Sequence, residues 1–334
     1  MQAILVPSTE PALNLALEEC LFNSLMPNNQ GYFLLWHNAP SIIVGRHQNT
    51  LAEVNGELVS RYKLPVIRRM TGGGAVYHDL GNLNYSFIRP LYPHEKGKID
   101  FATFLMPMVK ALHSLGLQAH FTSRNDITCG DKKISGSAQL RRQGKILHHG
   151  TLLVNLDLDM LGTVLTGAPD KYLSKGVNSI RSRVANVKEF MSINTQKDSS
   201  CYMDIIKQAL IQTCATEIID LDNNIWQEVE NLANAKYRAY NWNYGASPAF
   251  THEKRERFPW GLVQCHFDVH KGQVRQCKIF GDFFANSPIE ALEKSLQGID
   301  YSEVALSTAV QDINWQDYFA NCDSIKMQKF FCNI

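Results

Sequence analysis

The spacing of apolar residues predicts a helix near the start of the chain. Apolar side chains recur at helical intervals from residue 13 to residue 25. Thr9, Glu10 and Pro11 precede them, which supplies a capping hydroxyl, an acid and an early proline, as is typical of a helix start. The same reasoning predicts further helices over residues 101–115, closed by Gly116, and near residues 160–165, 202–214 and 225–236.

Short apolar runs bounded by turn residues predict a series of strands. They lie at residues 32–37, 41–45, 65–69, 75–78 and 83–88, and a later pair joins at Gly130 and Asp131 ahead of the strand "KILHHGTLLVNLD". Glycine, serine and proline interrupt the helical pattern at "NWNYGASPAF". A hairpin turning at Lys271-Gly272 follows, and then a helix with a capping box from Ser287 to Glu290. We therefore predict a large domain, residues 1–247, and a small α+β domain, residues 248–334.

Composition excludes several classes of protein. The net charge of +1 creates no strong field toward nucleic acid or an anionic membrane. No run of about 18 apolar residues predicts a membrane span, and the N-terminus lacks the basic start of a targeting segment. The eight cysteines include no C-x-x-C pair. We expect a cytoplasmic protein that binds neither nucleic acid nor membrane.

The run "VIRRMTGGGAVYHD" raises the first question of chemistry. Each glycine in an ordered segment costs roughly 0.5–1 kcal/mol relative to alanine, so three in succession need a reason. One reading is a tight turn, and the other is a place where another molecule touches bare backbone. Arg68 and Arg69 alternate faces of a strand, so only one can point into a site. Consecutive N–H groups with an arginine at their edge favour a phosphate or acyl-phosphate site.

The run "GDKKISGSAQ" offers a second candidate. Lys132 and Lys133 again lie on opposite faces, and both could be solvated lysines of a hairpin. The following Ser135, Gly136, Ser137 and Ala138 are all small, which leaves room for a ligand beside the strand. A lysine facing that gap would offer a point charge to a phosphate oxygen.

Three smaller features leave alternatives open. In "LHHGT", His148 and His149 diverge across a strand and cannot chelate one metal, while Gly150 would let something approach the backbone. Asp126 could cap a turn or face a magnesium–nucleotide site. The basic tip "QLRRQGK" could be a solvated face or a contact for an acidic partner.

The segments "RRMTGGGAVYHDLGNLNYSF", "RNDITCGDKKISGSAQ" and "HHGTLLVNLDLDML" resemble the successive motifs of lipoate–protein ligases. The resemblance extends to "NLALEEC", "IIVGRHQN", "GVNSIRSRVANV" and "PAFTHEKRERFPWG", and so covers nearly the whole chain. It implies an α/β large domain with the mixed sheet of biotin/lipoate ligases and a small C-terminal α+β domain. It also implies activation of lipoate by ATP to lipoyl-adenylate, then transfer of the lipoyl group to a lysine of an acceptor domain.

The resemblance also implies residue roles. Lys133 would be catalytic and contact both the adenylate phosphate and the lipoyl carbonyl, with Asp126 near the nucleotide and Mg²⁺. Thr71 and Tyr77 stand where serine and phenylalanine are common in the family. The residues implied to bind ATP or lipoyl-adenylate are Arg69, Gly73, Gly74, Ala75, Val76, Tyr77, His78, Asp126, Lys133, Ser135, Gly136, Ala138, His149 and Thr151.

These residue types suit such chemistry. A fixed lysine, with Mg²⁺, offsets the repulsion between an attacking carboxylate and the α-phosphate. The same lysine can stabilise the oxyanion of the transfer step, for which the acceptor lysine supplies the amine. The implied partners are lipoate or octanoate and apo lipoyl-domain proteins, namely E2 subunits of 2-oxoacid dehydrogenases and the glycine cleavage H protein, with the enzyme acting as a monomer.

Three rival readings are weighed against the ligase. An octanoyltransferase or lipoyl amidotransferase on the same scaffold uses a cysteine nucleophile, but the strand before "RND" carries His120, and Cys129 sits by a turn. The glycine loop does not follow the biotin-ligase pattern. A non-catalytic lipoyl-domain-binding protein would have no need to keep Arg69, the glycines and Lys133.

Overall fold

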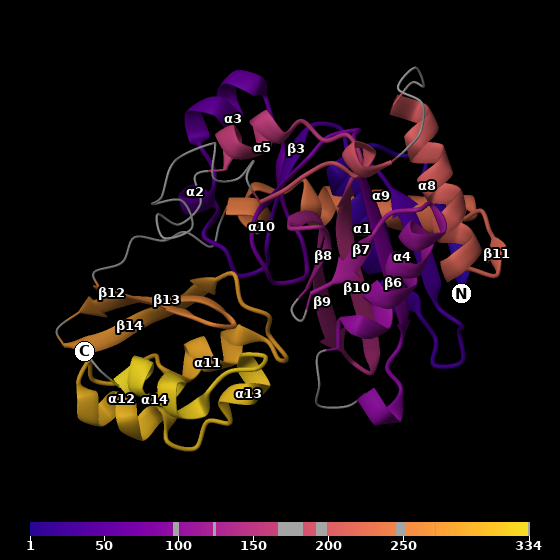
Figure 1. Ribbon diagram of the computed structural model, residues 1–334. Coiled ribbons are helices and arrows are strands. Elements are labelled where there is room, and N and C mark those ends of the chain that lie inside the picture. Colours follow the sequence, from indigo (N-terminus) through magenta and orange to yellow (C-terminus); the bar gives the residue numbers. More distant parts are fainter. Residues whose placement is uncertain are drawn as a thin grey trace.

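The large domain is built on a mixed sheet of eight strands (Figure 1). The computed structural model describes residues 1–95, 100–122, 125–165, 183–191, 199–244, 252–270 and 272–332. The sheet order is β11-β1-β2-β6-β10-β9-β8-β7. β1 runs parallel to β2 and β11, and the remaining neighbours are antiparallel. The strands are β1 (Gln2–Leu5), β2 (Tyr32–Trp36), β6 (Asn82–Pro90), β7 (Ala119–Phe121), β8 (Asp126–Cys129), β9 (Lys132–Arg142), β10 (Lys145–Leu153) and β11 (Glu217–Ile218).

Apolar residues on both faces of this sheet are buried, so it is a central layer. One face packs on helices α4 (Ala102–Ser114) and α8 (Ser199–Cys214). The other packs on α1 (Pro11–Ser24), α9 (Asn223–Leu232) and the π-helix η3 (Ala233–Tyr237). A second sheet of order β4-β3-β5 lies on this latter side and shares its apolar cluster.

The second sheet carries the glycine run between two of its strands. It comprises β3 (Ser41–Val44), β4 (Val66–Arg68) and β5 (Val76–His78). Its outer apolar side packs on the residues around α5. The surrounding short elements are α2 (Thr50–Glu53), α3 (Gly56–Tyr62), α5 (Leu158–Val164), α10 (Tyr240–Tyr244) and the 3₁₀ turns η1 (Pro93–Glu95) and η2 (Val187–Phe190).

Helix α1 is confirmed, but its predicted cap is wrong. The N-cap residue is Glu10, which makes no side-chain capping bond. Because α1 is enclosed between the two sheets and α9, polar side chains of the helix are buried as well, among them Asn14, Glu18 and Glu19. Buried polar groups require hydrogen-bond partners, and the partners of Glu18 are described with the active site below.

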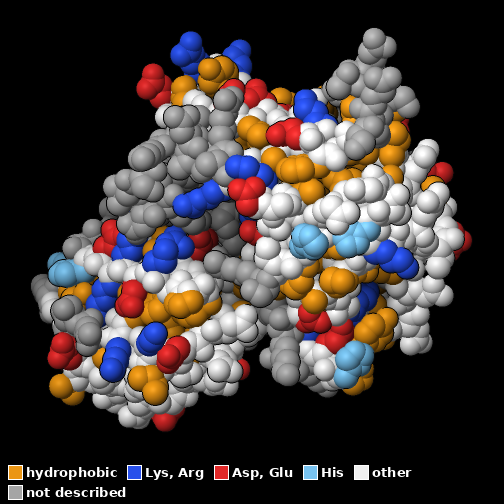
Figure 2. All heavy atoms as spheres, viewed as in Figure 1, with side chains coloured by type: hydrophobic (Ala, Val, Ile, Leu, Met, Phe, Trp, Pro, Cys, Tyr) orange, Lys and Arg blue, Asp and Glu red, His pale blue; other side chains and the backbone are white. Residues whose placement is uncertain are grey.

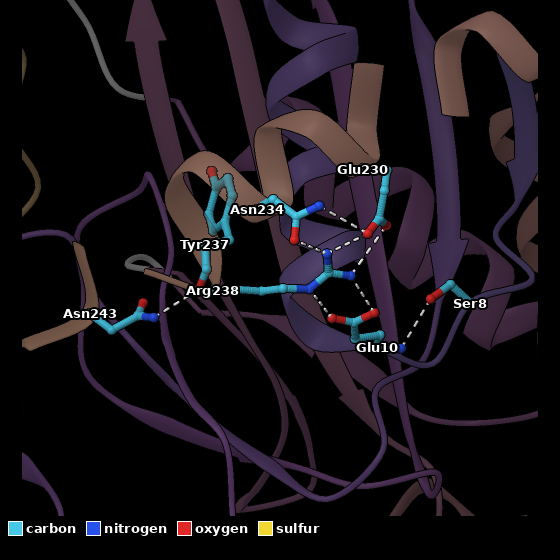
Figure 3. Close-up of polar contacts among 7 residues, drawn as sticks. All are labelled: Ser8, Glu10, Glu230, Asn234, Tyr237, Arg238 and Asn243. Atoms are coloured by element: carbon cyan, nitrogen blue, oxygen red, sulfur yellow. Dashed lines mark hydrogen bonds and ion pairs between the residues drawn. The ribbon is translucent and has the colours of Figure 1, made fainter. Parts of the chain in front are cut away.

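An arginine ties the first residues of the chain to the end of α9 (Figure 3). Arg238 donates to both carboxylate oxygens of Glu10, at 2.7 and 2.8 Å, and to Glu230 at 2.5 Å. Asn243 donates to the Tyr237 carbonyl at 2.8 Å. Asn243 also accepts from the backbone amide of Arg68 at 2.8 Å, so the same segment holds β4.

The C-terminal domain is the predicted small α+β unit. Its antiparallel sheet is β12 (His252–Phe258), β13 (Gly261–His270) and β14 (Gln273–Gly281). Its helices are α11 (Ile289–Ser295), α12 (Glu303–Val310), α13 (Trp315–Tyr318) and α14 (Ser324–Cys332), and together they enclose a separate apolar cluster. The predicted boundary at residues 247/248, within the stretch "GASPAF", lies outside the described residues.

The predicted capping box of α11 is wrong, and the reason is a contact between domains. Pro288 occupies the N-cap and makes no side-chain bond. Glu290 instead pairs with Arg46 of the large domain, with 2.5 Å between Nη2 and Oε1. The Gly281 amide donates to the His47 carbonyl at 2.7 Å, and the His47 ring stacks on Phe283 at 5.0 Å. The small domain therefore docks on the loop after β3.

The surface agrees with the near-neutral charge of the chain. On the face shown in Figure 2, acidic and basic side chains are interspersed over the described residues. Within the described ranges, no helix is long and apolar enough to cross a membrane.

Candidate active site

A cavity of about 380 Å³ opens between the large sheet, the glycine loop and the small domain. Thirteen of the fourteen residues implied to bind ATP or lipoyl-adenylate lie in its wall. They are Arg69, Gly73, Gly74, Ala75, Val76, Tyr77, His78, Asp126, Lys133, Gly136, Ala138, His149 and Thr151.

Ser135 is the exception. A bulge in the β8–β9 pairing, between Lys133 and Ser135, interrupts the alternation and turns Ser135 to the face opposite Lys133. Its hydroxyl there lies 3.2 Å from that of Tyr85. Gly150 lines the cavity, so the predicted approach of another molecule to its backbone stays a prediction. A Cβ on Gly150 would lie 2.3 Å from Tyr85 Oη.

Lys133 stands on the β9 wall of the cavity beside a carboxylate. Its Nζ lies 2.8 Å from Asp126 Oδ1, and the two side chains are 39% and 29% exposed. A Cβ on Gly136 would lie 2.8 Å from Nζ, so this glycine makes room for the lysine. Lys132 is absent from the described wall, in keeping with the predicted alternation.

The glycine loop forms the opposite wall and encloses Arg69. The guanidinium Nη2 donates to the carbonyls of Gly72 at 2.7 Å and Gly74 at 2.8 Å. Nη1 donates to the Ile43 carbonyl at 3.2 Å, and Nε donates to Thr71 Oγ1 at 3.0 Å. Burial lowers the pKa of Arg69 to about 10, which leaves it charged at neutral pH. The implied contact of Arg69 with a nucleotide stays a prediction, because here its donors serve the loop.

Close approaches of backbone explain part of the glycine run. A Cβ on Gly72 would lie 2.2 Å from the carbonyl oxygen of Phe283 in the small domain. Gly73 has φ +90° and donates its amide to the same carbonyl at 3.3 Å. Two of the three glycines therefore meet a backbone of the same chain, and the predicted contact of the loop with another molecule stays a prediction.

The neighbouring Arg68 points away from the cavity and is buried. Its Nη1 donates to the carbonyls of Gly45 at 2.9 Å and Gln48 at 2.7 Å. Its own amide donates to Asn243 Oδ1 at 2.8 Å. As alternation predicted, one arginine of this pair lines the cavity, and it is Arg69, the one that the family resemblance implied.

The two adjacent histidines diverge as predicted. His148 stacks on Phe104 in the core, with 4.6 Å between ring centroids. His149 lines the cavity, where Nδ1 lies 2.9 Å from Glu18 Oε1 and Nε2 lies 2.7 Å from Thr71 Oγ1. Sequence reasoning missed Glu18. The feature that could have indicated it is a charged residue on the buried face of α1.

Three cavity residues from the small domain were also missed, namely Arg257, Asp282 and Phe284. Phe284 packs on Phe101 of the large domain, with 5.4 Å between ring centroids. Arg257 lies within the terminal motif quoted above, but nothing in its spacing indicated a place in the cavity.

Comparison with known proteins identifies the family. The model of the lipoyl protein ligase A/B catalytic domain matches residues 10–215, and that of the bacterial lipoate protein ligase C-terminus matches residues 247–331. Lipoate–protein ligase 1 of Staphylococcus aureus is 41% identical over 94% of each chain. Lipoate-protein ligase LplJ of Bacillus subtilis is 39% identical over 93% of this chain and 94% of its own. This chain belongs to the lipoate–protein ligase family.

Solved structures of the family share the fold. P. falciparum LipL1 in complex with lipoate has a TM-score of 0.79 and 27% identity over 99% of each chain. A bipartite lipoate protein ligase of Thermoplasma acidophilum, described with its E2 lipoyl domain, has a TM-score of 0.63 and 29% identity over 75% of this chain and 98% of its own. A lipoate-protein ligase A bound with ATP has a TM-score of 0.59 and 28% identity over 73% of this chain and 99% of its own. The predicted mixed α/β large domain with a small C-terminal α+β domain, as in lipoate ligases, is therefore confirmed.

The rival octanoyltransferase or lipoyl amidotransferase is not favoured for this ligase-family chain. None of the eight cysteines lies in the described wall of the cavity. Cys129 is buried, and burial raises the pKa of its thiol, which suppresses the thiolate that a nucleophile needs.

Proposed function

We propose that this protein is an ATP-dependent lipoate–protein ligase. In the first step, the lipoate carboxylate oxygen attacks the α-phosphorus of ATP and pyrophosphate leaves. In the second, the ε-amine of an acceptor lysine attacks the acyl carbon, AMP leaves, and the amine loses a proton to form the amide. The observation that carries the proposal is the Lys133–Asp126 pair, which stands on an open wall of the cavity opposite the glycine loop.

Lys133 would act in both steps. Its ammonium is held at the cavity by Asp126 rather than buried, so a phosphate oxygen can replace part of that contact. During adenylation it would balance charge between the carboxylate and the α-phosphate, and during transfer it would stabilise the oxyanion at the acyl carbon. No side-chain nucleophile is needed, which agrees with a described wall that contains no cysteine.

Mg²⁺ would bind mainly through the nucleotide. Within the described residues, no three His, Cys, Asp or Glu side chains are grouped to hold a metal ion. Mg²⁺ commonly takes one or two protein carboxylates together with substrate phosphates, and Asp126 in the wall fits that donor set. When bound with ATP, the ion would offset phosphate charge.

The acceptors would be apo lipoyl-domain proteins, namely E2 subunits and the glycine cleavage H protein. The Thermoplasma relative, described with its E2 lipoyl domain, supports this class of partner. Lipoate is the proposed acid, with octanoate as an alternative substrate. We further propose that the enzyme works as a monomer and that it is cytoplasmic. Its free, scattered cysteines support the cytoplasmic location.

The test is ATP–pyrophosphate exchange by the purified chain with lipoate, octanoate or no acid. We expect exchange that depends on lipoate, followed by transfer to an apo lipoyl domain. Binding to the lipoyl domain without any exchange would favour the non-catalytic reading instead.

A further inference from the structure

We propose that Glu18 is a positioning residue of this ligase, acting through His149 and Thr71 on Arg69 and thereby on the glycine loop. The inference rests on the proposed function and deepens it. Its basis is a continuous chain of buried hydrogen bonds that joins helix α1 to the loop.

The bonds at Glu18 fix the proton on the imidazole of His149. Ser86 Oγ accepts from Trp36 Nε1 at 2.8 Å, so its single hydrogen goes to Glu18 Oε1 at 2.5 Å. The carboxylate also forms a hydrogen bond with His149 Nδ1, which lies 2.9 Å from Oε1 and 3.0 Å from Oε2. A carboxylate only accepts hydrogen bonds. The ring therefore carries its hydrogen on Nδ1, and Nε2 is left as an acceptor.

The hydrogen bonds at Thr71 fix which group donates and which accepts in the rest of the network. A guanidinium only donates, so Thr71 Oγ1 accepts from Arg69 Nε at 3.0 Å. The single hydrogen of the threonine then goes to His149 Nε2 at 2.7 Å. Every donor in the chain meets an acceptor in this one arrangement, with a neutral His149.

The hydrogen-bond network ends at the glycine loop. Arg69 Nη2 holds the carbonyls of Gly72 and Gly74, and Gly73 and Gly74 line the cavity. With those carbonyls turned to the guanidinium, their partial negative charge is withdrawn from an incoming phosphate. Trp36 and His149, at the other end, also line the cavity. One network thus joins Trp36 in the cavity wall to the glycine loop.

The experiment replaces Glu18 with its amide isostere. In Glu18→Gln, the amide oxygen keeps the hydrogen bond from Ser86 and the new NH₂ takes the place of Oε2, where it faces His149 Nδ1. The His149 ring is therefore expected to move its hydrogen to Nε2 and oppose the Thr71 hydroxyl. An unsatisfied buried group destabilises the network that holds the loop, and about 1.4 kcal/mol of that cost, passed on to the loop, corresponds to a tenfold weaker binding of ATP. We therefore expect the ATP dissociation constant, by calorimetry, and the KM for ATP to rise about tenfold while kcat changes little. Nitrogen NMR should report the change of His149 tautomer.

Variants at Thr71 provide the matched series. Thr71→Val removes the hydroxyl at similar volume and should weaken ATP binding to the same degree, whereas Thr71→Ser keeps the hydroxyl and should bind ATP normally. Glu18→Gln combined with Thr71→Val should be no worse than either alone, because both break the same chain.

Glu19→Gln is the control on the helix. Glu19 is the next residue and is also buried, but it accepts from Lys236 Nζ at 2.6 Å and Tyr237 Oη at 2.6 Å, which do not belong to the hydrogen-bond network of Glu18. The Glu19→Gln variant should leave the ATP dissociation constant unchanged. Normal ATP binding with an unchanged tautomer in Glu18→Gln would overturn the inference, and so would an equal loss in Glu19→Gln. Absence of lipoate-dependent exchange in the unaltered enzyme would instead overturn the proposed function, and the tautomer and ATP-binding measurements would still decide the role of Glu18.

Discussion

The two walls of the cavity each carry a basic residue, and they hold it in opposite ways. On the β9 wall, Lys133 is 39% exposed and has Asp126 as its partner. On the glycine-loop wall, Arg69 is 6% exposed and donates to three carbonyls and a hydroxyl. The first charge faces the space where a ligand would lie, and the second is enclosed by the loop that it organises.

The walls also differ in what supports them. The β9 wall belongs to the eight-stranded sheet and is fixed by its neighbours β8 and β10. The loop wall is supported from outside by the Phe283 carbonyl, which accepts from the Gly73 amide, and the small domain is itself held against α4 by Phe284 packed on Phe101. We infer that the β9 wall supplies the reacting charge, whereas the loop wall is assembled by Arg69 and the small domain.

The largest expected effect is at the lysine. Lys133→Ala should lower the overall rate of ligation on the order of 10²–10³-fold, because one donor at the developing charge is lost, while circular dichroism shows an intact fold. Lys132→Ala is the matched control and should be close to the unaltered enzyme, since Lys132 lies outside the described wall. If both variants lose activity equally, the assignment of faces is wrong.

Removal of the small domain should separate the two steps. A chain ending at Ser247 keeps the β9 wall but loses the support of the loop, and it also opens the cavity to water. We expect it to fail in making lipoyl-adenylate from lipoate and ATP, yet to pass the lipoyl group from preformed adenylate to an acceptor domain. The paired assays are made after circular dichroism shows that the truncated chain is folded. Normal adenylation would contradict the proposed role of the small domain.

The smallest expected effect is on stability at the loop. Gly73 has φ +90°, and a Cβ there would lie 2.9 Å from Arg69 Nη2. A left-handed backbone costs an L-residue about 1–2 kcal/mol, and each kcal/mol lowers the melting temperature of a domain of this size by about 2–4 °C. Gly73→Ala should therefore melt a few degrees lower. An unchanged melting temperature would show that the loop is free to adjust.

Sequence reasoning predicted much of the fold because it rests on local patterns. Alternation separated Lys133 from Lys132 and His149 from His148, and the family resemblance indicated which of each pair faces the cavity. Turn residues located the strand pairs around Gly130 and Gly272. It missed Glu18, Arg257 and Phe284 because their places depend on packing between segments far apart in the chain. For the same reason it treated Arg69 as an open charge, since the carbonyls that enclose it are oriented by the folded loop.

The most direct test of the two-wall account is transfer from preformed lipoyl-adenylate to an acceptor domain, measured side by side for Lys133→Ala and Arg69→Met. Both variants are expected to be poor in adenylation, for different reasons. In transfer, the account predicts that Lys133→Ala is slowed on the order of 10²–10³-fold, whereas Arg69→Met retains most of the rate because its contacts organise the loop. Equal loss of transfer in the two variants would show that Arg69 acts on the adenylate directly and would contradict the account.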